Sequence, residues 1–170
     1  MKIIKFDPKY RDDEQKVITF RSLQTTELSL LTNLCKYKDV NEMICENTRD
    51  IEKGTIDIFT LFLGKKLIGE LRVKYISDDI RFAEKDKRAY LYAFRIHKKY
   101  QNKGYGKFLL ENVLDILKEN GCSEFTVGVE DDNLRARYIY EKYGFTEPIA
   151  RIKESYQGNS YEYDLLLKRN

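Results

Sequence analysis

Two glycines, Gly104 and Gly106, lie in the segment Gln101–Lys107, which reads QNKGYGK. Glycine lets a backbone turn tightly and bring its amide N–H groups close to a ligand. At a helix start those amides also favour negative charge, because the helix dipole is positive there. This chemistry suits a pyrophosphate group. The segment is not a Walker loop and lacks the third glycine of G-x-G-x-x-G, so taken alone it favours a tight turn over a phosphate site.

A second segment whose residues could take part in a reaction is Asn133–Phe145, which reads NLRARYIYEKYGF. Asn133 can cap a helix through its side-chain oxygen. Three tyrosines follow, and their phenol groups are possible proton donors. Spacing alone does not distinguish Tyr138, Tyr140 and Tyr143 from one another.

The hydrophobic pattern predicts the elements that position these two segments. Apolar residues recur at helical spacing from Gly104 to Leu117, with Gly121 as a C-terminal cap, and the alternating stretch 89–96 precedes them as a strand. Further strands are expected at 17–21, 56–63, 67–76, 125–129, 151–156 and 161–167, and further helices begin near residues 25, 39 and 133. Hairpins at both ends of a strand–helix–strand unit indicate an α/β (α+β) fold with a mixed sheet and helices on its faces.

Composition supports one globular domain over residues 1–170, although residues 1–16 carry no recognisable pattern. The chain has 31 Lys plus Arg against 28 Asp plus Glu, and 42% of its residues are hydrophobic. No apolar run approaches the roughly 20 residues that a bilayer crossing needs. No secretory signal is recognisable, which predicts a cytoplasmic protein. Three cysteines without C-x-x-C spacing and one histidine, His97, predict neither a disulfide framework nor a metal site.

The order and spacing of the two motifs closely resemble the GNAT superfamily of acetyl-CoA-dependent N-acetyltransferases. In that family a strand leads into [Q/R]-x-x-G-x-[G/A], matched here by Gln101–Gly106. A later helix carries N-x-x-A-x-x-x-Y-E-K-x-G-F, matched by Asn133–Phe145. The likeness is strongest over Ala89–Phe145. It implies a mixed, mostly antiparallel central sheet of about seven strands with helices on both faces.

The resemblance also implies acetyl-CoA as co-substrate, with no metal. The end of the strand at 89–96 would pair its backbone with the pantetheine arm, and the glycine loop would hold the pyrophosphate. Asn133 would contact the cofactor arm. The cofactor-binding residues implied in this way are Phe94, Arg95, Ile96, Gln101, Asn102, Lys103, Gly104, Tyr105, Gly106, Lys107, Asn133 and Tyr140.

Among the three tyrosines, the family pattern selects Tyr140 as the general acid that protonates the departing CoA thiolate. A phenol has a reference pKa of about 10, near that of an alkyl thiol, so we expect this proton transfer to be nearly matched in energy. Simpler interpretations remain open. Asn133 can be only a helix cap, and Tyr140 only a packing residue. Lys98, Lys99, Lys103 and Lys107 can form a solvated face instead of assisting the 3′-phosphate of CoA.

The general base is not specified by the pattern. Many family members carry a glutamate on the strand at 89–96, where this chain has Tyr92. Glu70 and Glu130 are acidic candidates for the base or for contacts with the amine, and solvent is a third. Both can also be ordinary surface carboxylates. Glu70 shares a strand face with Arg72, so an ion pair is an alternative role for it.

The resulting hypothesis is an acetyl-CoA-dependent N-acetyltransferase in which a small-molecule or peptide primary amine attacks the thioester directly. Among the acidic residues of the polar segment 77–88, Asp78, Asp79 and Glu84 favour a small cationic amine. The alternatives are a non-catalytic acyl-CoA-binding module and an RNA-binding domain built on Lys98–Lys107. Mixed charge disfavours nucleic acid as a partner, and no membrane partner is expected. The resemblance implies that the terminal strands can form a homodimer.

Overall fold

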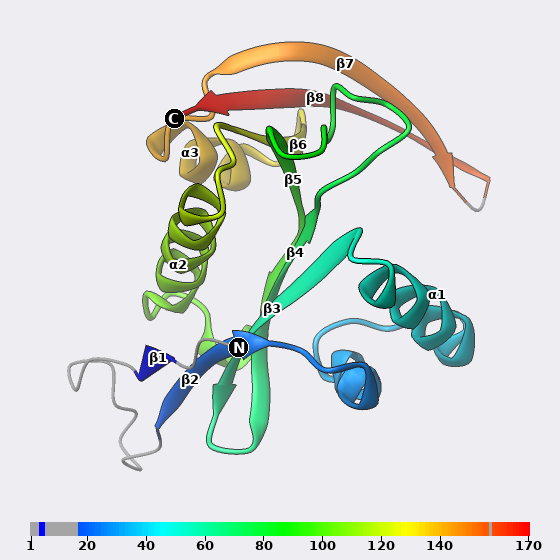
Figure 1. Cartoon of the computed structure of the whole chain (residues 1–170), viewed down its shortest axis with the longest axis vertical. Coiled ribbons are helices and arrows are strands. Elements are labelled where there is room, and N and C mark those ends of the chain that lie inside the picture. The colour runs from blue at the N-terminus through cyan, green and yellow to red at the C-terminus, as the bar shows by residue number, and fades with distance from the viewer. Residues whose placement is uncertain (1–3, 6–16, 157) are drawn as a thin grey trace. The chain divides into compact units, whose positions relative to one another are not determined.

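The computed structural model describes residues 4–5, 17–156 and 158–170 (Figure 1). These residues form two compact units. The first contains the described residues up to Val73 together with Ala93–Ile116, and the second contains Lys74–Tyr92 and Leu117–Asn170. Strand β5 (Arg88–Ile96) and helix α2 (Tyr105–Glu119) contribute residues to both units.

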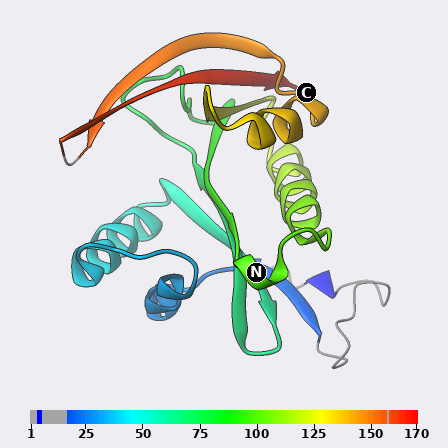
Figure 2. The ribbon, with the colours of Figure 1, turned by 180° about the vertical axis from the view of Figure 1, so that it is seen from behind.

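The first unit is built on strands hydrogen-bonded in the order β1-β2-β3-β4-β5. Its other elements are β1 (Ile4–Lys5), β2 (Ile18–Ser22), η2 (Thr25–Asn33), α1 (Val40–Glu52), β3 (Ile56–Leu63), β4 (Lys66–Lys74) and η3 (Lys98–Tyr100). Strand β2 pairs antiparallel with both β1 and β3. Helices α1 and α2 lie on opposite sides of the β3–β4 strands (Figures 1 and 2).

The core under α1 explains the form of the segment before it. Leu28 and Leu31 are fully buried and pack with Met43, Ile58 and Leu67. These leucines recur every three residues, which matches the three residues per turn of a 3₁₀ helix. The helix predicted from residue 25 is accordingly a 3₁₀ helix, η2.

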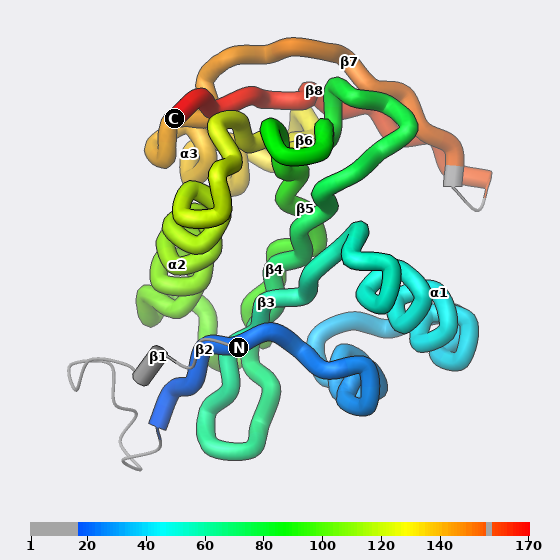
Figure 3. The backbone as a smooth tube through the Cα atoms, in the orientation of Figure 1, coloured from blue at the N-terminus to red at the C-terminus, as the bar shows by residue number. Residues whose placement is uncertain are grey.

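The second unit contains strands in the order β5-β6-β8-β7. Its other elements are β6 (Glu124–Glu130), α3 (Leu134–Lys142), β7 (Glu147–Tyr156) and β8 (Asn159–Arg169). Strand β6 pairs parallel with β5 and antiparallel with β8, and β7 pairs antiparallel with β8. The last two strands run together as one long hairpin (Figure 3).

The mixed, mostly antiparallel arrangement with helices on both faces confirms the predicted fold class. The short strand β1 was not expected, because residues 1–16 show no alternation. Strand β7 begins at Glu147, four residues before the predicted start at Arg151. The register shift between Pro148 and Ala150 interrupts the regular alternation there, which hides the strand's first residues from a sequence pattern.

Candidate functional site

The extended backbone of strand β5 is interrupted at Ala93. The backbone of this residue has φ of 50°, a left-handed value that is uncommon for any residue other than glycine. Among the described residues, the pairing of β5 with β6 runs from Arg88 to Leu91 and goes no further. The regular β5–β6 ladder therefore ends before the segment Phe94–Ile96, to which the family resemblance assigns the pantetheine arm.

Two hydrogen bonds fix the chain where it leaves β5. The His97 N–H donates to the carbonyl oxygen of Ile68 in β4 at 2.8 Å. The Gln101 side-chain amide donates to the carbonyl oxygen of Ile96 at 2.9 Å. A Cβ atom on Gly69 would lie 2.7 Å from Cδ1 of Ile96, so the absence of a side chain at Gly69 lets Ile96 pack across β4. Gln101 is thus a positioning residue for the loop that it begins.

The loop after Gln101 turns through two left-handed residues, Asn102 with φ of 61° and Gly104 with φ of 86°. The Phe108 N–H donates to the carbonyl oxygen of Gly104 at 3.1 Å, which begins the hydrogen bonding of α2. The N–H groups of Gly106 and Lys107 precede this bond in the first turn of the helix. Helix α2 has no acidic residue in its first turn. The local arrangement therefore favours an anion at this helix start.

Side chains around the loop have separate roles. A Cβ atom on Gly106 would lie 3.5 Å from the Phe94 ring and 3.6 Å from Ile96, so α2 starts close against β5. Tyr105 is buried with its ring centroid 6.4 Å from that of Tyr100. Lys107 is exposed and lies 3.8 Å from Glu111 in a surface ion pair.

Glu70 is fully buried in β4 and forms two ion pairs. Its Oε2 accepts from Nε of Arg72 at 2.8 Å, and its Oε1 accepts from Nη1 of Arg95 at 2.6 Å. Arg72 also donates to the Tyr37 hydroxyl at 2.6 Å and to Oδ1 of Asn47 at 3.4 Å. The ion pair that the sequence analysis gave as an alternative role for Glu70 is present. The alternative that Glu70 is an ordinary surface carboxylate is wrong, because its side chain is buried.

Asn133 caps α3. Its Oδ1 accepts from the Ala136 N–H at 3.1 Å, which satisfies one of the amides at the helix start. The capping role proposed as one alternative is therefore confirmed. Contact between Asn133 and a cofactor stays a prediction.

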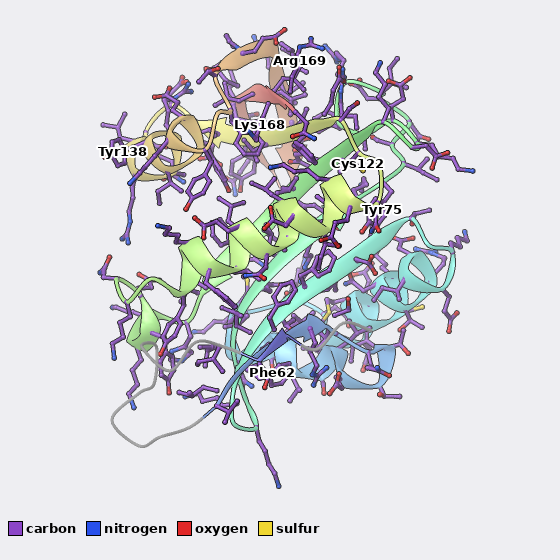
Figure 4. The ribbon with its side chains drawn as sticks, turned by 60° about the vertical axis from the view of Figure 1, so that its left-hand side comes forward. Phe62, Tyr75, Cys122, Tyr138, Lys168 and Arg169 are labelled. Carbon is purple, nitrogen blue, oxygen red and sulfur yellow. The ribbon has the colours of Figure 1, made fainter. Side chains whose placement is uncertain are left out.

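Burial distinguishes the tyrosines of α3, which spacing could not. Tyr140 is 8% exposed and its ring packs edge-on against Phe145, with centroids 5.7 Å apart. Tyr138 projects from the same helix and is 68% exposed (Figure 4). Burial raises the pKa of Tyr140 well above its ordinary value, because it disfavours the charged phenolate. The expected match between this phenol and a thiol is therefore corrected: the buried hydroxyl is the weaker acid.

The second unit holds a tyrosine cluster that the sequence analysis missed. The rings of Tyr90 and Tyr92 stack with centroids 5.5 Å apart, and the Tyr163 hydroxyl donates to Oε1 of Glu154 at 2.7 Å. A Cβ atom on Gly128 would lie 2.8 Å from the Tyr163 ring, so only glycine fits beneath it. Burial raises the pKa of Tyr90 to about 12. The glycine inside β6 was the available signal, since a strand glycine often marks a close approach.

The remaining candidates lie in the same unit. Glu130 ends β6, is exposed, and stands opposite Tyr163 in the register. Tyr92, which replaces the family's frequent glutamate, has the Nζ atom of Lys74 5.9 Å from its ring centroid.

The described residues contain neither a membrane-spanning helix nor a metal-binding cluster. No helix there is both long enough and apolar enough to cross a membrane. No group of three or more His, Cys, Asp or Glu side chains within the described ranges could hold a metal ion.

Two curated proteins show local similarity. The chain is 41% identical over 68 residues to a ribosomal protein bS18 alanine N-acetyltransferase of Haemophilus influenzae, covering 40% of this chain and 44% of that protein. It is 37% identical over 60 residues to a mycothiol acetyltransferase of Beutenbergia cavernae, covering 35% of this chain and 20% of that protein. The similar region therefore spans less than half of either relative.

Solved structures share the fold. A spermidine N-acetyltransferase SpeG chimera from Vibrio cholerae and hSSAT has a TM-score of 0.71 at 20% identity, covering 89% of this chain and 95% of that one. The ribosomal-protein-S18-alanine N-acetyltransferase of Escherichia coli has a TM-score of 0.69 at 20% identity, covering 89% and 93%. The family model of the acetyltransferase (GNAT) family matches residues 25–145, which is more than half of the sequence. The chain therefore belongs to the acetyltransferase (GNAT) family.

Proposed function

We propose that the protein transfers the acetyl group of acetyl-CoA to a primary amine by direct attack of the amine on the thioester. The observation that carries this proposal is the loop between β5 and α2, where left-handed Asn102 and Gly104 lead into the amides of a helix start. Membership of the family supplies the reaction class. A fold neighbour, YncA of Salmonella typhimurium, was solved with its cofactor acetyl-CoA.

In this proposal the phosphate-binding loop and the pantetheine-binding end of β5 belong to the first unit, and Asn133 belongs to the second. The loop Gln101–Lys107 holds the pyrophosphate through backbone amides, because a helix start favours negative charge. The backbone of Phe94, Arg95 and Ile96 pairs with the pantetheine amides beyond the irregular residue Ala93. Asn133 contacts the cofactor arm in addition to capping α3.

Tyr140 acts as the general acid. Its high pKa keeps the phenol protonated at neutral pH, so the hydroxyl carries the proton that the acid must supply. Negative charge develops on sulfur as the thioester breaks, and a donor at that point stabilises the transition state more than the ground state. The proton then passes from the phenol oxygen to the sulfur, and a proton from solvent restores the phenol.

Deprotonation of the attacking amine is assigned to Glu130 or to solvent. Both oxygens of Glu70 already accept from guanidinium groups, which supports a positioning role for that residue. Glu130 is exposed at the end of β6 and forms no ion pair within the described part of the chain.

The acceptor is proposed to be a small cationic amine. Of the three acidic residues of the segment 77–88 that the sequence analysis named, Asp79 pairs with Arg81 and Glu84 pairs with Lys87. Asp78, the third of them, forms no such pair among the described residues, and we assign it to attracting the amine. The relatives' names specify three different acceptors, so they support an amine without selecting one.

Two measurements test the function. Calorimetric titration should show binding of acetyl-CoA, and a panel of polyamines, amino acids, amino sugars and peptide N-termini should release free thiol in the presence of one class. Binding of acetyl-CoA without turnover on any amine would favour the acyl-CoA-binding alternative. Thermal stabilisation by RNA and not by acetyl-CoA would contradict the enzyme proposal.

A further inference from the structure

A row of hydrogen-bonded side chains in the second unit leads from β5 to the surface of the terminal hairpin. The Tyr163 hydroxyl in β8 donates to Oε1 of Glu154 in β7 at 2.7 Å. The Tyr163 hydroxyl is also hydrogen-bonded to the hydroxyl of Tyr90 in β5. Both tyrosines are half-buried, whereas Glu154 is exposed. The three side chains therefore connect a half-buried phenol with solvent.

Gly128 in β6 lets the two tyrosines meet. A Cβ atom at this position would lie 2.8 Å from Cε2 of Tyr163 and 3.4 Å from the hydroxyl oxygen of Tyr90. Two further rings hold Tyr90. It stacks on Tyr92 with centroids 5.5 Å apart, and it packs edge-on against Phe82 with centroids 4.9 Å apart. Packing as well as hydrogen bonding therefore fixes the positions of the two hydroxyl groups.

The hydrogen-bond donors in this row point toward the surface. A phenol has one proton to donate. Tyr163 donates its proton to Glu154, so the Tyr163 oxygen is left to accept from Tyr90. Burial raises the pKa of Tyr90 to about 12, so its phenolate is not populated at neutral pH. A proton that reaches the Tyr90 oxygen is therefore expected to displace the Tyr90 proton to Tyr163, and the Tyr163 proton to Glu154, in one step.

Tyr90 also lies near the proposed general acid. Tyr90 and Tyr140 belong to the same unit. Burial raises the pKa of Tyr140, and a negative charge on Tyr90 raises it further, so the two phenols lie within electrostatic reach of each other. The amine has to approach the carbonyl carbon that is bonded to the sulfur on which Tyr140 is proposed to act. The attacking amine therefore comes close to Tyr90 as well.

We propose that Tyr90, Tyr163 and Glu154 form a relay that carries a proton from the attacking amine to solvent. This inference rests on the proposed function, and it specifies the route for the deprotonation assigned there to Glu130 or to solvent. The ammonium nitrogen gives a proton to the Tyr90 oxygen, the Tyr90 proton passes to the Tyr163 oxygen, and the Tyr163 proton passes to the Glu154 carboxylate. Each phenol gains one proton and loses one, and Glu154 releases its proton to water.

The nitrogen then has the lone pair that forms the bond to the thioester carbonyl carbon, and the carbon–sulfur bond breaks. As the amide forms, the nitrogen loses a second proton to solvent. This proton balances the one that Tyr140 gives to sulfur and regains from solvent. One proton is thus released per acetyl group transferred, and it leaves through Glu154.

The pH dependence of kcat/KM for the amine, measured by thiol release at saturating acetyl-CoA, tests the relay. Tyr163→Phe keeps the ring over Gly128 but breaks the relay, and Glu154→Gln keeps an oxygen that accepts from Tyr163 but cannot take up a proton. In the parent the bound ammonium is deprotonated by the relay, so kcat/KM should change less than about threefold between pH 7 and 9.

In both variants only the amine that is already neutral can react. For a primary alkylamine with a pKa of about 10.4, the neutral fraction rises about tenfold per pH unit over this range, and kcat/KM should rise with it. The loss at pH 7 should be about 10²-fold or more. Tyr161→Phe is the matched control, because it removes a phenol from the same strand two residues before Tyr163 and should keep the flat profile of the parent.

Each other outcome counts against the relay. Activity lowered equally at every pH in Tyr163→Phe and Glu154→Gln would show a packing role alone. A parent profile that already rises about tenfold per pH unit, or a steep profile in Tyr161→Phe, would overturn the inference too. A profile changed by Glu130→Gln and not by the relay variants would assign the base to Glu130.

The test also separates the relay from the function on which it rests. Glu154 is exposed, so Glu154→Gln decides the question if Tyr163→Phe fails to fold. A parent that acetylates amines while both relay variants keep its profile overturns the relay and leaves the proposed function intact. A folded parent that acetylates no amine of the panel contradicts the proposed function itself, and the relay with it.

Discussion

The hydroxyl of Tyr140 can be removed with little disturbance of packing, because phenylalanine keeps the ring that contacts Phe145. If this hydroxyl is the general acid, Tyr140→Phe should lower kcat by about 10²- to 10⁴-fold. Affinity for acetyl-CoA should change little, since the donor acts on charge that develops as the thiolate leaves. Pre-steady-state measurement of acetyl transfer is the check. Tyr138→Phe, on the exposed side of α3, is the matched control. Transfer at the parent rate in Tyr140→Phe would assign the proton to another source.

Position 104 requires glycine for its backbone conformation and, in the proposed function, for the approach of phosphate. Its φ of 86° is strained for any residue with a side chain, and a β-branched residue adds bulk where the amides would approach phosphate. Gly104→Val should weaken CoA binding by more than about tenfold, or about 1.4 kcal/mol. Gly121→Val provides a comparison, because Gly121 has φ of 91° and ends the same helix away from the loop. Calorimetry that finds equal CoA affinity in both folded variants would reject the loop assignment.

Glu70 supports two buried or half-buried guanidinium groups, so its charge matters for stability. Glu70→Gln leaves Arg72 without its carboxylate partner in a buried site. Breaking a buried ion pair in this way typically lowers the free energy of unfolding by about 3 kcal/mol or more. Loss of the second pair, with Arg95, adds less because the Arg95 side chain is 37% exposed. Urea denaturation should show this destabilisation. Glu130→Gln, at an exposed position, should leave stability nearly unchanged but raise the KM of the amine. Equal stability of Glu70→Gln and the parent would contradict the structural role of the ion pairs.

At the scale of elements, substitutions of Asn133 can separate its role as the cap of α3 from a contact with the cofactor. Asn133→Ala removes the acceptor for the Ala136 N–H and should destabilise the protein by about 1 kcal/mol. Asn133→Asp keeps that acceptor, so its stability should be close to that of the parent. If Asn133 also contacts the cofactor through its amide, both variants weaken acetyl-CoA binding. Unchanged affinity in the aspartate variant would leave Asn133 as a cap alone.

Elements with a strong local pattern could be predicted from the sequence, and contacts set by tertiary structure could not. The α2 helix and its Gly121 end follow from apolar spacing. The helix expected to begin near residue 39 is α1, which Asp39 caps by accepting from the Glu42 N–H at 2.9 Å. By contrast, the burial of Glu70 depends on Arg95, which lies 25 residues away in sequence. Lys66 and Lys99, whose Nζ atoms lie 5.4 and 5.7 Å from the centroid of the Tyr100 ring, likewise come from separate segments. No spacing rule within one element reveals such pairs.

At the scale of the whole molecule, the chain's two compact units divide the candidate residues. Glu70 and the loop Gln101–Lys107 belong to the first unit, whereas Glu130, Asn133 and Tyr140 belong to the second. The proposed function assigns the phosphate-binding loop to the first unit and the acid, the candidate base and the Asn133 contact to residues of the second. The single-domain expectation stays a prediction, testable by whether both units unfold in one transition.

Stability of the whole protein should fall at alkaline pH through its buried tyrosines. Burial raises the folded-state pKa of Tyr140 well above the unfolded value of about 10, and raises that of Tyr90 to about 12. Between the two pKa values the unfolded chain has released a proton that the folded chain retains. The contribution of each buried tyrosine to the free energy of unfolding is therefore fully present below about pH 10. It falls as pH rises, by about 1.4 kcal/mol per pH unit for a tyrosine that is ionised in the unfolded chain and protonated in the folded protein.

Tyr140→Phe removes one of these linked protons, so its unfolding free energy should fall less steeply than that of the parent between about pH 10 and 11.5. Urea denaturation at several pH values measures the two slopes, and comparing slopes cancels the titration of lysines common to both proteins. Tyr138→Phe removes an exposed phenol from the same helix and should keep the parent slope. Identical slopes for all three proteins would mean that the Tyr140 phenol is as accessible to water in the folded protein as in the unfolded chain. In that case Tyr140 would not have the buried environment that the proposed general acid requires. This stability measurement therefore also tests the mechanism.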